Sequence, residues 1–428
     1  EALMKTFKRD YPNYFDLKYE KAPIKISEIQ TQILAPKQAL VEYFIGNDAL
    51  YIWNIQKNKT HFYQKANPQQ IDTLVEAVRL AVTDTEARRK APEATFSNYT
   101  SNAATLSNLL LDAIQKEENV NRLMIIPDDK LGYLPFEILL TKSVDTKTPN
   151  YKNLPYLIED YSVSYAYASK LFFQKRKGNP SQYLAGFAPN YESLTQDTSS
   201  NTKLATLVRS GETKLPGALK EVQNITSTHN GKAFIGEQAD EANFKKNASK
   251  YQILHLSMHA LIDEEYPMRS HLVFESMPSK QDNMLQLGEL YNMNIPADMV
   301  VLSACNSGFG QIRTGDGVQS LATAFNYAGA KSTIMSLWKV PDQSTSPLMI
   351  DFYNELHQEQ TKDAALRHAK LNYMSEAVAD ELAHPFYWAG FIASGDMAII
   401  QKHQNSWTWW LFGGLGVLIL GFLFVRFR

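Results

Sequence analysis

Short apolar runs alternate with longer amphipathic stretches along most of this chain. In the first part, two apolar runs flank the turn Gly46-Asn47-Asp48, which predicts a β-hairpin. The apolar runs that predict strands here are 39–45, 49–55 and 122–127, the stretches with helical periodicity are 69–90 and 101–118, and 134–140 is a further buried run. Strands that alternate with helices favour an α/β fold with a mainly parallel sheet.

From residue 183 the alternation becomes regular. The expected strands are 183–188, 232–235, 251–257, 299–303, 332–337 and 385–393, and the expected helices are 216–229, 239–248, 317–328, 344–358 and 362–379. This doubly wound pattern places function at the carboxyl ends of the strands. We expect an adaptor segment over 1–35, an N-terminal α/β half over 36–180 and a second half over 181–400.

Two of the apolar runs lead to side chains that can react. The run 251–257 leads to His259, and the run 299–303 leads to Cys305, the only cysteine in 428 residues. A cysteine attacks a carbonyl as its thiolate, and a histidine can take the thiol proton and return it to the leaving amine. Small residues follow both side chains, and we expect the backbone amides of Ala260 and Cys305 to bind the oxyanion.

Each of these residues also has an ordinary structural interpretation. A lone cysteine at a strand end is most often a small buried hydrophobic residue. A lone histidine most often either has hydrogen-bond partners for its ring nitrogens or is exposed to solvent. Their occurrence together, at strand ends and beside small residues, favours catalysis. His255 is expected to be structural. A zinc site made by His255, His259 and Cys305 is disfavoured because it lacks a second cysteine or a close carboxylate, so no metal or cofactor is expected.

Composition narrows the class of function. The net charge is −2, with 43 Lys and Arg against 45 Asp and Glu, and no long basic run occurs, so we expect no nucleic-acid partner. A hydrophobic content of 44% is sufficient for sizeable cores. A single thiol excludes an intramolecular disulfide and is compatible with either side of a bacterial or organellar membrane.

The apolar run 407–425 differs from the others in its length, because 19 consecutive residues contain no charge. As a helix it would be about 28 Å long, close to the thickness of a bilayer core. Tryptophans lie at one end and two arginines follow the other, which predicts a single C-terminal transmembrane helix. The arginines favour a cytoplasmic C-terminus with the large folded part outside, and a tail-anchored protein that faces the cytoplasm is the open alternative.

A polar segment and a single aspartate add two further predictions. Residues 192–214 are poor in large apolar side chains, which predicts a surface loop and the preferred place for proteolytic cleavage.

Asp316 lies between Gly315 and Gly317, where it could line a pocket for the substrate residue before the scissile bond. We prefer the alternative that Asp316 caps a helix beginning near Gly317, since aspartate is a favoured N-cap.

The segments LHLSMHA (254–260) and LSACNSG (302–308) resemble the two signatures of the CHAT peptidases, a caspase- and separase-like family often fused to tetratricopeptide repeats. Further similar segments are RTGDG at 313–317, SLWKV at 336–340, HPFYWAGF at 384–391, and, upstream, 126–137 and 157–161. Met258 and Asp316 depart from the residues usual in the family, and neither replaces a reacting group.

The resemblance implies a caspase-like, mainly parallel sheet flanked by helices, with a pseudo-caspase-like N-terminal half. It also implies a cysteine endopeptidase with His259 as base and Cys305 as nucleophile, and a protein or peptide substrate. A regulatory protein partner would bind through tetratricopeptide repeats upstream of this segment. The alternatives are a catalytically silent scaffold for protein interaction and a cysteine acyltransferase or amidase.

Overall fold

The computed structural model describes Lys5, Arg9 and residues 24–401, without 67, 113, 115–118, 146–147, 168–171, 174–177, 192–213, 264, 277–282, 304–307, 309 and 314–316. Cys305, Asp316, nearly all of the expected loop 192–214 and the expected membrane span 407–425 therefore lie outside the described residues. Within the described part of the chain, no helix is both long and apolar enough to cross a membrane.

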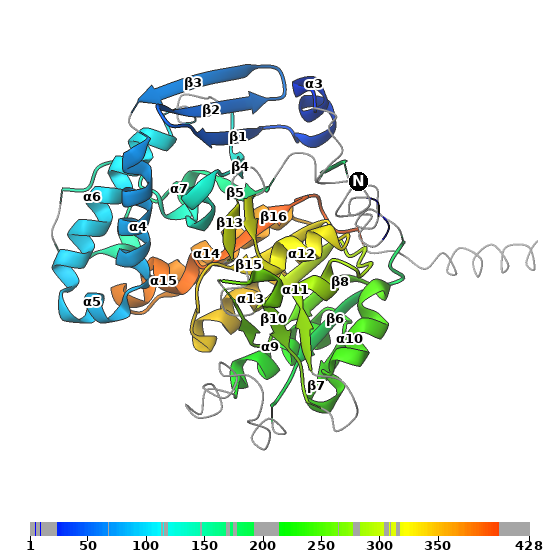
Figure 1. Cartoon of the computed structure of the whole chain (residues 1–428). Coiled ribbons are helices and arrows are strands. Elements are labelled where there is room, and N and C mark those ends of the chain that lie inside the picture. Colours follow the sequence, from blue (N-terminus) through cyan, green and yellow to red (C-terminus); the bar gives the residue numbers. More distant parts are fainter. Residues whose placement is uncertain are drawn as a thin grey trace, which may run out of the picture.

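Eleven strands of the described chain form one mixed sheet in the order β3-β2-β1-β4-β5-β16-β15-β12-β8-β6-β7 (Figure 1). Their bounds are β1 Gln38–Ile45, β2 Ala49–Gln56, β3 Thr60–Ala66, β4 Arg122–Ile126, β5 Ser162–Tyr165, β6 Gln182–Ala188, β7 Lys232–Ile235, β8 Tyr251–Leu256, β12 Met299–Leu302, β15 Ser332–Ser336 and β16 Phe391–Gly395. Two small sheets add β9 Ala260–Leu261, β10 His271–Val273 and β11 Met284–Gln286, and β13 Gln311–Arg313 with β14 Gly317–Gln319.

The α-helices of the described chain pack on both faces of the sheet. They are α3 Ile26–Glu28, α4 Gln69–Thr83, α5 Thr85–Lys90, α6 Pro92–Leu110, α7 Leu157–Asp160, α9 Pro216–Thr228, α10 Glu241–Asn247, α11 Leu287–Leu290, α12 Leu321–Tyr327, α13 Asp342–His357, α14 Lys362–Glu376 and α15 Pro385–Trp388. Shorter helical turns include η1 Ile29–Ile33, η2 Asp129–Tyr133 and η3 Phe136–Ile138.

The N-terminal half begins with the predicted hairpin, which the structure confirms. β1 and β2 pair antiparallel, and the turn is closed by a 2.9 Å hydrogen bond from the Gly46 amide to the Ala49 carbonyl. Alternate side chains of β1 face opposite layers. The Tyr43 hydroxyl donates to the Leu110 carbonyl at the end of α6, whereas Leu40, on the other face, packs with Ile29. β3 was not predicted, and it is one of the two edge strands of the described sheet, with β7 at the other edge.

In the second half, β6, β8, β12 and β15 run parallel, as the sequence predicts. A Cβ at Gly186 of β6 would meet α9, while the next side chain, Phe187, lies 5.4 Å from Phe244 of α10. Successive residues of a strand point to opposite faces, so α9 and α10 cover different faces of the sheet. Phe325 of α12 lies 6.4 Å from Phe244 and therefore belongs to the layer of α10.

The structure corrects two predicted boundaries in this half. The expected helix 317–328 begins as β14, and α12 starts only at Leu321, where the Ser320 hydroxyl accepts a hydrogen bond from the Thr323 amide at 3.3 Å. The expected strand 385–393 begins as α15, with Pro385 in its first turn. Proline is favoured at the start of a helix because it has no N–H to donate. β16 then pairs antiparallel with β15.

The predicted helices of the N-terminal half also have different bounds. The stretch 69–90 is interrupted at Asp84, whose carboxylate accepts a hydrogen bond from the Ala87 amide at 2.8 Å and caps α5. Of the expected stretch 101–118, residues 101–110 belong to α6, which begins earlier, at Pro92, and ends at Leu110.

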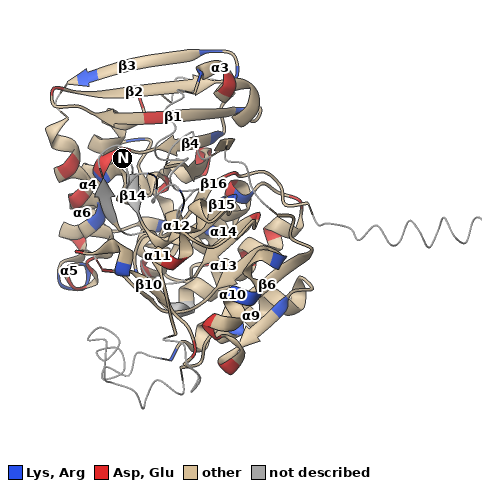
Figure 2. Ribbon diagram, turned by 45° about the vertical axis from the view of Figure 1, so that its right-hand side comes forward, with Lys and Arg blue, Asp and Glu red and all other residues tan. Residues whose placement is uncertain are grey.

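The two halves share one sheet and one hydrophobic core. β5 and β16 join at the pair Tyr165 and Ser394. Across the same junction, the buried Lys370 ammonium of α14 donates to the Glu137 carboxylate at 2.7 Å. Basic and acidic side chains are interspersed over the ribbon, in keeping with the net charge of −2 (Figure 2).

Candidate active site

The register of two neighbouring strands aligns the ends of the runs that lead to the two predicted reactive positions. β8 and β12 pair parallel, and Leu256 is the partner of Leu302 at their carboxyl ends. His259 and Cys305 are each three residues beyond these partners. Neighbouring strands lie about 4.8 Å apart, so the two segments leave the sheet side by side. The structure describes His259 and the chain as far as Ser303, and Cys305 falls just beyond it.

His259 is held in a buried position, with 6% of its surface exposed. Its backbone amide donates to the Tyr191 hydroxyl at 2.8 Å, and its carbonyl accepts from the Val273 amide at 2.9 Å. The Tyr191 ring lies 5.0 Å from the imidazole, centroid to centroid. The main chain on both sides of the His259 side chain is therefore anchored.

Tyr191 is a residue of the site that sequence analysis missed. It follows β6 and has a positive φ of 57°, and its hydroxyl also donates to the Val273 carbonyl at 2.8 Å. The buried Glu275 carboxylate accepts from the Tyr191 amide at 2.6 Å and from the Asn190 amide at 3.0 Å. The only signal in the sequence is a tyrosine just after an apolar run, and it does not reveal that the ring reaches His259.

The Ala260 amide, one of the two expected oxyanion donors, is not used by the β9–β10 ladder. The hydrogen bond from Val273 to the His259 carbonyl makes the pair Ala260 and Leu272 a non-hydrogen-bonded pair of the β9–β10 ladder. In such a pair the N–H groups point away from the partner strand. β9 is the edge strand of its small sheet within the described chain, so the Ala260 N–H points out of the ladder.

The glycine after Cys305 has a packing role. The Gly308 amide donates to the Ser336 carbonyl at the end of β15 at 2.9 Å, and an added Cβ would lie 3.1 Å from the Met335 side chain. Gly308 therefore lies beside the carboxyl end of β15, and the contact with Met335 accounts for the absence of a side chain at this position.

A small cavity of about 20 Å³ lies beneath these strand ends, lined among others by Ser257, Met258 and Ser303. Such a volume is sufficient for one water molecule. The buried Ser303 hydroxyl has no hydrogen-bond partner among the residues that the structure describes. A water in this cavity would satisfy the Ser303 hydroxyl.

His255 occupies a buried polar cluster between β8 and the helices. One ring nitrogen lies 2.7 Å from the Glu221 carboxylate of α9, and the other lies 3.1 Å from the Tyr353 hydroxyl of α13. Burial raises the pKa of Tyr353 well above its usual value, so this hydroxyl stays protonated. Both ring nitrogens of His255 are engaged, as expected for a structural histidine.

Comparison with known proteins shows which family and which relatives this chain is similar to. The CHAT domain family matches residues 100–396. Tetratricopeptide repeat protein 28 of Homo sapiens is 33% identical over 119 residues, and its Mus musculus counterpart is 31% identical over the same length. In both cases the match covers 28% of this chain and 5% of the relative.

Among solved structures, the separase of the Saccharomyces cerevisiae separase–securin complex aligns with a TM-score of 0.50 at 9% identity, over 92% of this chain and 34% of that one. The Arg-specific cysteine proteinase gingipain R aligns with a TM-score of 0.39 at 11% identity, over 70% of this chain and 68% of that one. The family match spans both halves of the sheet and includes the strands that lead to His259 and Cys305. The chain therefore belongs to the CHAT domain family.

Proposed function

We propose that this chain is a cysteine endopeptidase in which His259 is the general base and Cys305 the nucleophile. The observation that carries the proposal is the pairing of Leu256 with Leu302, from which both residues are three positions away. The anchored backbone of His259 supports it, because a general base must be held in place relative to the group that it deprotonates. Family membership supports the same chemistry.

The proposed reaction has two halves. His259 takes the proton of the Cys305 thiol, and the thiolate sulfur bonds to the scissile carbonyl carbon, while the Ala260 and Cys305 amides donate to the oxyanion. The C–N bond then breaks, and the imidazolium gives its proton to the leaving amine. Water, deprotonated by His259, attacks the remaining thioester, which releases the acid and restores the thiol.

A peptide-library cleavage assay tests this proposal. Wild-type protein should cleave a subset of peptides, and Cys305→Ala should cleave none. Alkylation of Cys305 by iodoacetamide near neutral pH should slow markedly in His259→Ala and stay unchanged in His368→Ala, a half-exposed histidine remote in sequence from the site. Identical cleavage profiles for wild type and Cys305→Ala would favour the silent scaffold, and acyl transfer without hydrolysis would favour the acyltransferase.

Asp316 is proposed as a determinant of substrate preference. The helix expected to begin near Gly317 begins at Leu321, with Ser320 as its N-cap, which favours the pocket interpretation of Asp316 over the helix cap. Asp316→Asn should lower cleavage after basic residues relative to neutral ones in the same peptide library. An unchanged ratio would remove Asp316 from the pocket.

The proposal also includes a membrane anchor over 407–425, extracytoplasmic placement of the folded part, and a regulatory protein partner that binds through upstream tetratricopeptide repeats. The uncharged apolar run supports the anchor, and the tetratricopeptide repeat proteins among the relatives support the partner. Deletion of 407–428 should move the protein from the membrane to the soluble fraction. Continued sedimentation with membranes would count against the anchor, and cleavage within 192–214 on activation would be visible as two fragments.

A further inference from the structure

The two edge strands of the large sheet differ in how they are protected (Figure 1). β7 has four residues, and its Lys232 ammonium lies 4.9 Å from the centroid of the Phe234 ring. A short edge strand that carries a lysine resists pairing with another chain. β3 has seven residues and no proline, and within the described chain it pairs with β2 alone. A longer edge strand of this kind is a template for one further strand.

The hairpin between β2 and β3 shows which backbone groups face the free side of β3. The Gln56 amide donates to the Lys59 carbonyl at 2.8 Å, so these two residues form a hydrogen-bonded pair. Hydrogen-bonded and non-hydrogen-bonded pairs alternate along an antiparallel ladder. Thr60, Phe62 and Gln64 are therefore in non-hydrogen-bonded pairs with β2, and their N–H and C=O groups point away from it.

Aromatic side chains lie on one face of the hairpin, next to this edge. Phe62 of β3 is the partner of Trp53 of β2, and the centroids of their rings are 4.7 Å apart. The Tyr51 ring lies 6.0 Å from Phe62 and 6.1 Å from Phe44 of β1. Phe44, Phe62 and Trp53 are 55%, 49% and 38% exposed. Contiguous exposed aromatic side chains mark an interaction surface.

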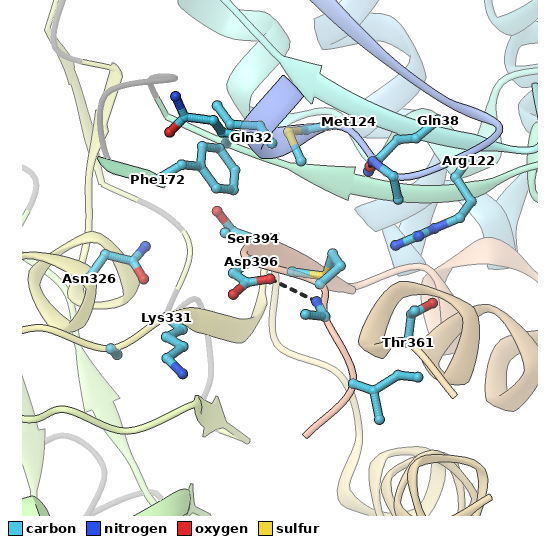
Figure 3. Close-up of a pocket in the computed structure, with 18 of the residues that line it drawn as sticks. Gln32, Gln38, Arg122, Met124, Phe172, Asn326, Lys331, Thr361, Ser394 and Asp396 are labelled. Atoms are coloured by element: carbon cyan, nitrogen blue, oxygen red, sulfur yellow. Dashed lines mark hydrogen bonds between the residues drawn. The ribbon is translucent and has the colours of Figure 1, made fainter. Parts of the chain in front are cut away.

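The other end of the same face is already covered. Ile29 and Leu34, from the segment before β1, pack with Leu40 and Ile55. A cavity of about 810 Å³, at the edge of the sheet opposite to His259, lies between this segment and β16 (Figure 3). The aromatic face therefore continues a surface on which part of this chain already packs.

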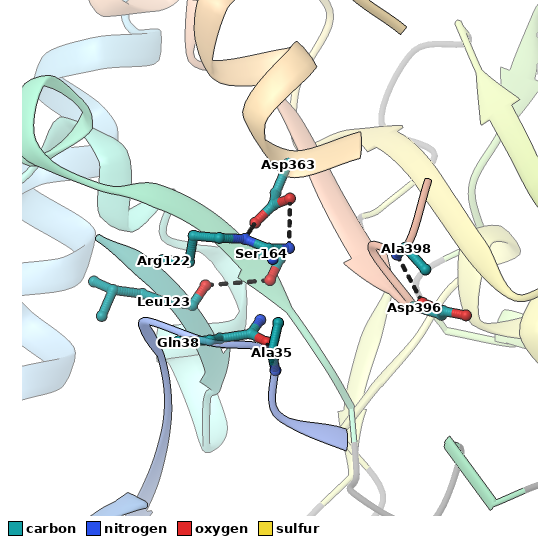
Figure 4. Close-up of polar contacts among 8 residues, drawn as sticks. All are labelled: Ala35, Gln38, Arg122, Leu123, Ser164, Asp363, Asp396 and Ala398. Atoms are coloured by element: carbon teal, nitrogen blue, oxygen red, sulfur yellow. Dashed lines mark hydrogen bonds and ion pairs between the residues drawn. The ribbon is translucent and has the colours of Figure 1, made fainter. Parts of the chain in front are cut away.

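Polar contacts fix the β1 side of the hairpin to the rest of the molecule (Figure 4). The Ala35 amide donates to the Gln38 side chain at 3.0 Å. Arg122 of β4, the partner of Gln38 in the ladder, forms two parallel hydrogen bonds with the buried Asp363 carboxylate, at 2.8 and 2.9 Å. The hairpin is thus held firmly at β1, and its β3 side is the one that can accept a partner.

The charges along this edge select the kind of partner. Residues 57–66 contain no acidic residue and three lysines, Lys57, Lys59 and Lys65. Lys65 lies 3.6 Å from the Asp112 carboxylate, so the positive charge is concentrated at the end of β3 that holds Lys57 and Lys59. Asp48 lies in the turn at the other end of β2. A partner strand with acidic residues at the Lys59 end complements this distribution.

A second copy of this chain fits less well. The register that pairs all seven residues of two antiparallel β3 strands puts His61 opposite Lys65, and the register that brings the two Phe62 rings together puts Lys59 opposite Lys65. Like charges directly opposite one another are destabilising. Either dimer would also join two strands that carry lysines and no acidic residue.

We propose that β3 and the aromatic face beside it bind an extended segment of a different protein, which adds to the sheet as an antiparallel strand. The segment bonds to the outward backbone groups of Thr60, Phe62 and Gln64, which supply affinity. Apolar side chains at its alternate positions contact Phe62 and Trp53, and acidic residues lie at the Lys59 end. This surface and His259 are in different halves of the sheet, so binding does not depend on peptidase activity.

Fluorescence anisotropy with fluorescein-labelled peptides tests the proposal on the full chain. The probe is TVTVTVDED, whose acidic carboxyl end lies beside Lys59 when it pairs antiparallel with β3. Wild-type protein should bind this probe. TVTVTVKKK, with the opposite charge, should bind weakly, and TVTPTVDED, which lacks one backbone donor of the strand, should not bind.

Variants of the edge separate backbone, side-chain and charge contributions. Gln64→Pro removes an outward N–H, which an edge strand tolerates, so binding should be lost with little change in melting temperature. Phe62→Ser should weaken binding about tenfold. Lys59→Glu should reverse the preference between TVTVTVDED and TVTVTVKKK. Val378→Ser, at an apolar residue of the second half that is 91% exposed, is the matched control and should bind as wild type does.

Any of three results would overturn the proposal: no binding to wild-type protein, equal binding of the acidic and basic peptides, or binding that survives both Gln64→Pro and Phe62→Ser. Two further results would overturn it by naming another occupant. A dimer in light scattering that dissociates in Gln64→Pro would assign the edge to a second copy. Binding that appears only after deletion of residues 1–23 would assign it to the amino-terminal segment of this chain.

Discussion

At the scale of single residues, Tyr191 is the side chain that most directly positions His259. Its hydroxyl accepts from the His259 amide and donates to the Val273 carbonyl, and its own amide is held by the Glu275 carboxylate. The residue is 1% exposed and adopts a left-handed conformation that is uncommon for a residue with a side chain. Hydrogen bonds from several directions therefore maintain an otherwise unfavourable backbone next to the proposed base.

We expect Tyr191→Phe to lower kcat by about tenfold to a hundredfold with little change in KM, because displacement of a base by a fraction of an ångström is costly in rate. The measurement is steady-state cleavage of the best library peptide. Tyr353→Phe is the matched control, since its buried hydroxyl contacts His255 instead. An equal loss of kcat in both variants would mean that the effect comes from general destabilisation.

A second prediction at the residue scale concerns His384 and the dependence of folding stability on pH. It is 1% exposed, and burial, with a smaller contribution from the nearby Arg88 guanidinium, holds its pKa well below the usual 6.5. The unfolded chain then binds a proton that the folded chain does not. Stability is therefore present above about pH 6.5 and is lost as pH falls, by about 1.4 kcal/mol per pH unit from this group alone.

His384→Asn removes this titration while retaining a side-chain acceptor for the Phe386 amide, which bonds to His384 at 3.1 Å. Thermal unfolding from pH 7 to pH 5 should show a smaller loss of stability in the variant than in wild type. Parallel curves would mean that His384 is protonated in the folded protein.

At the scale of elements, sequence pattern predicted the strands more reliably than their boundaries. β8 and β12 occur where the apolar runs predict them, because short apolar runs between turn residues have few other stable conformations. The predicted start of α12 and the predicted start of the last strand were wrong. Gly317 pairs with Arg313 in a small hairpin, and Pro385 begins a helical turn. Both outcomes depend on partners distant from the local pattern.

Gly308→Ala tests the contact between two such elements. The new methyl group would lie 3.1 Å from the Met335 side chain and 3.2 Å from the Ser336 carbonyl, so β15 or the loop must shift, at a cost of about 1–3 kcal/mol. The free energy of unfolding in urea measures this cost. Gly288→Ala is the control, since its nearest neighbour is 3.5 Å away and alanine is the better helix former. Equal stability of the two variants would show that the Gly308 contact is not tight.

At the scale of the whole molecule, we expect the two halves to unfold as one cooperative unit. They share the eleven-stranded sheet and a core that includes residues from both. The Lys370–Glu137 pair lies at their junction, with Tyr165 donating to the second Glu137 oxygen at 2.5 Å. Burial lowers the pKa of Lys370, and the adjacent carboxylate opposes this effect.

Glu137→Gln should destabilise the protein by about 3–5 kcal/mol, because it leaves a buried ammonium without its counter-charge. Calorimetry should show one unfolding transition at a lower temperature. Glu86→Gln, which breaks the exposed ion pair with Lys90, should hardly change the unfolding temperature. Two separate transitions in Glu137→Gln would contradict a shared core.

The sequence by itself determined the alternation of strands and helices and the family, and it is the source of the two proposed reactive positions, because apolar periodicity and strand-end chemistry are local properties of the chain. Only the tertiary structure decided which side chains surround them. Tyr191 reaches His259 across 68 residues, and Glu275 reaches Tyr191 across 84. The cavity at the opposite edge gathers residues from both ends of the described chain. Such contacts arise from packing, which no local pattern encodes.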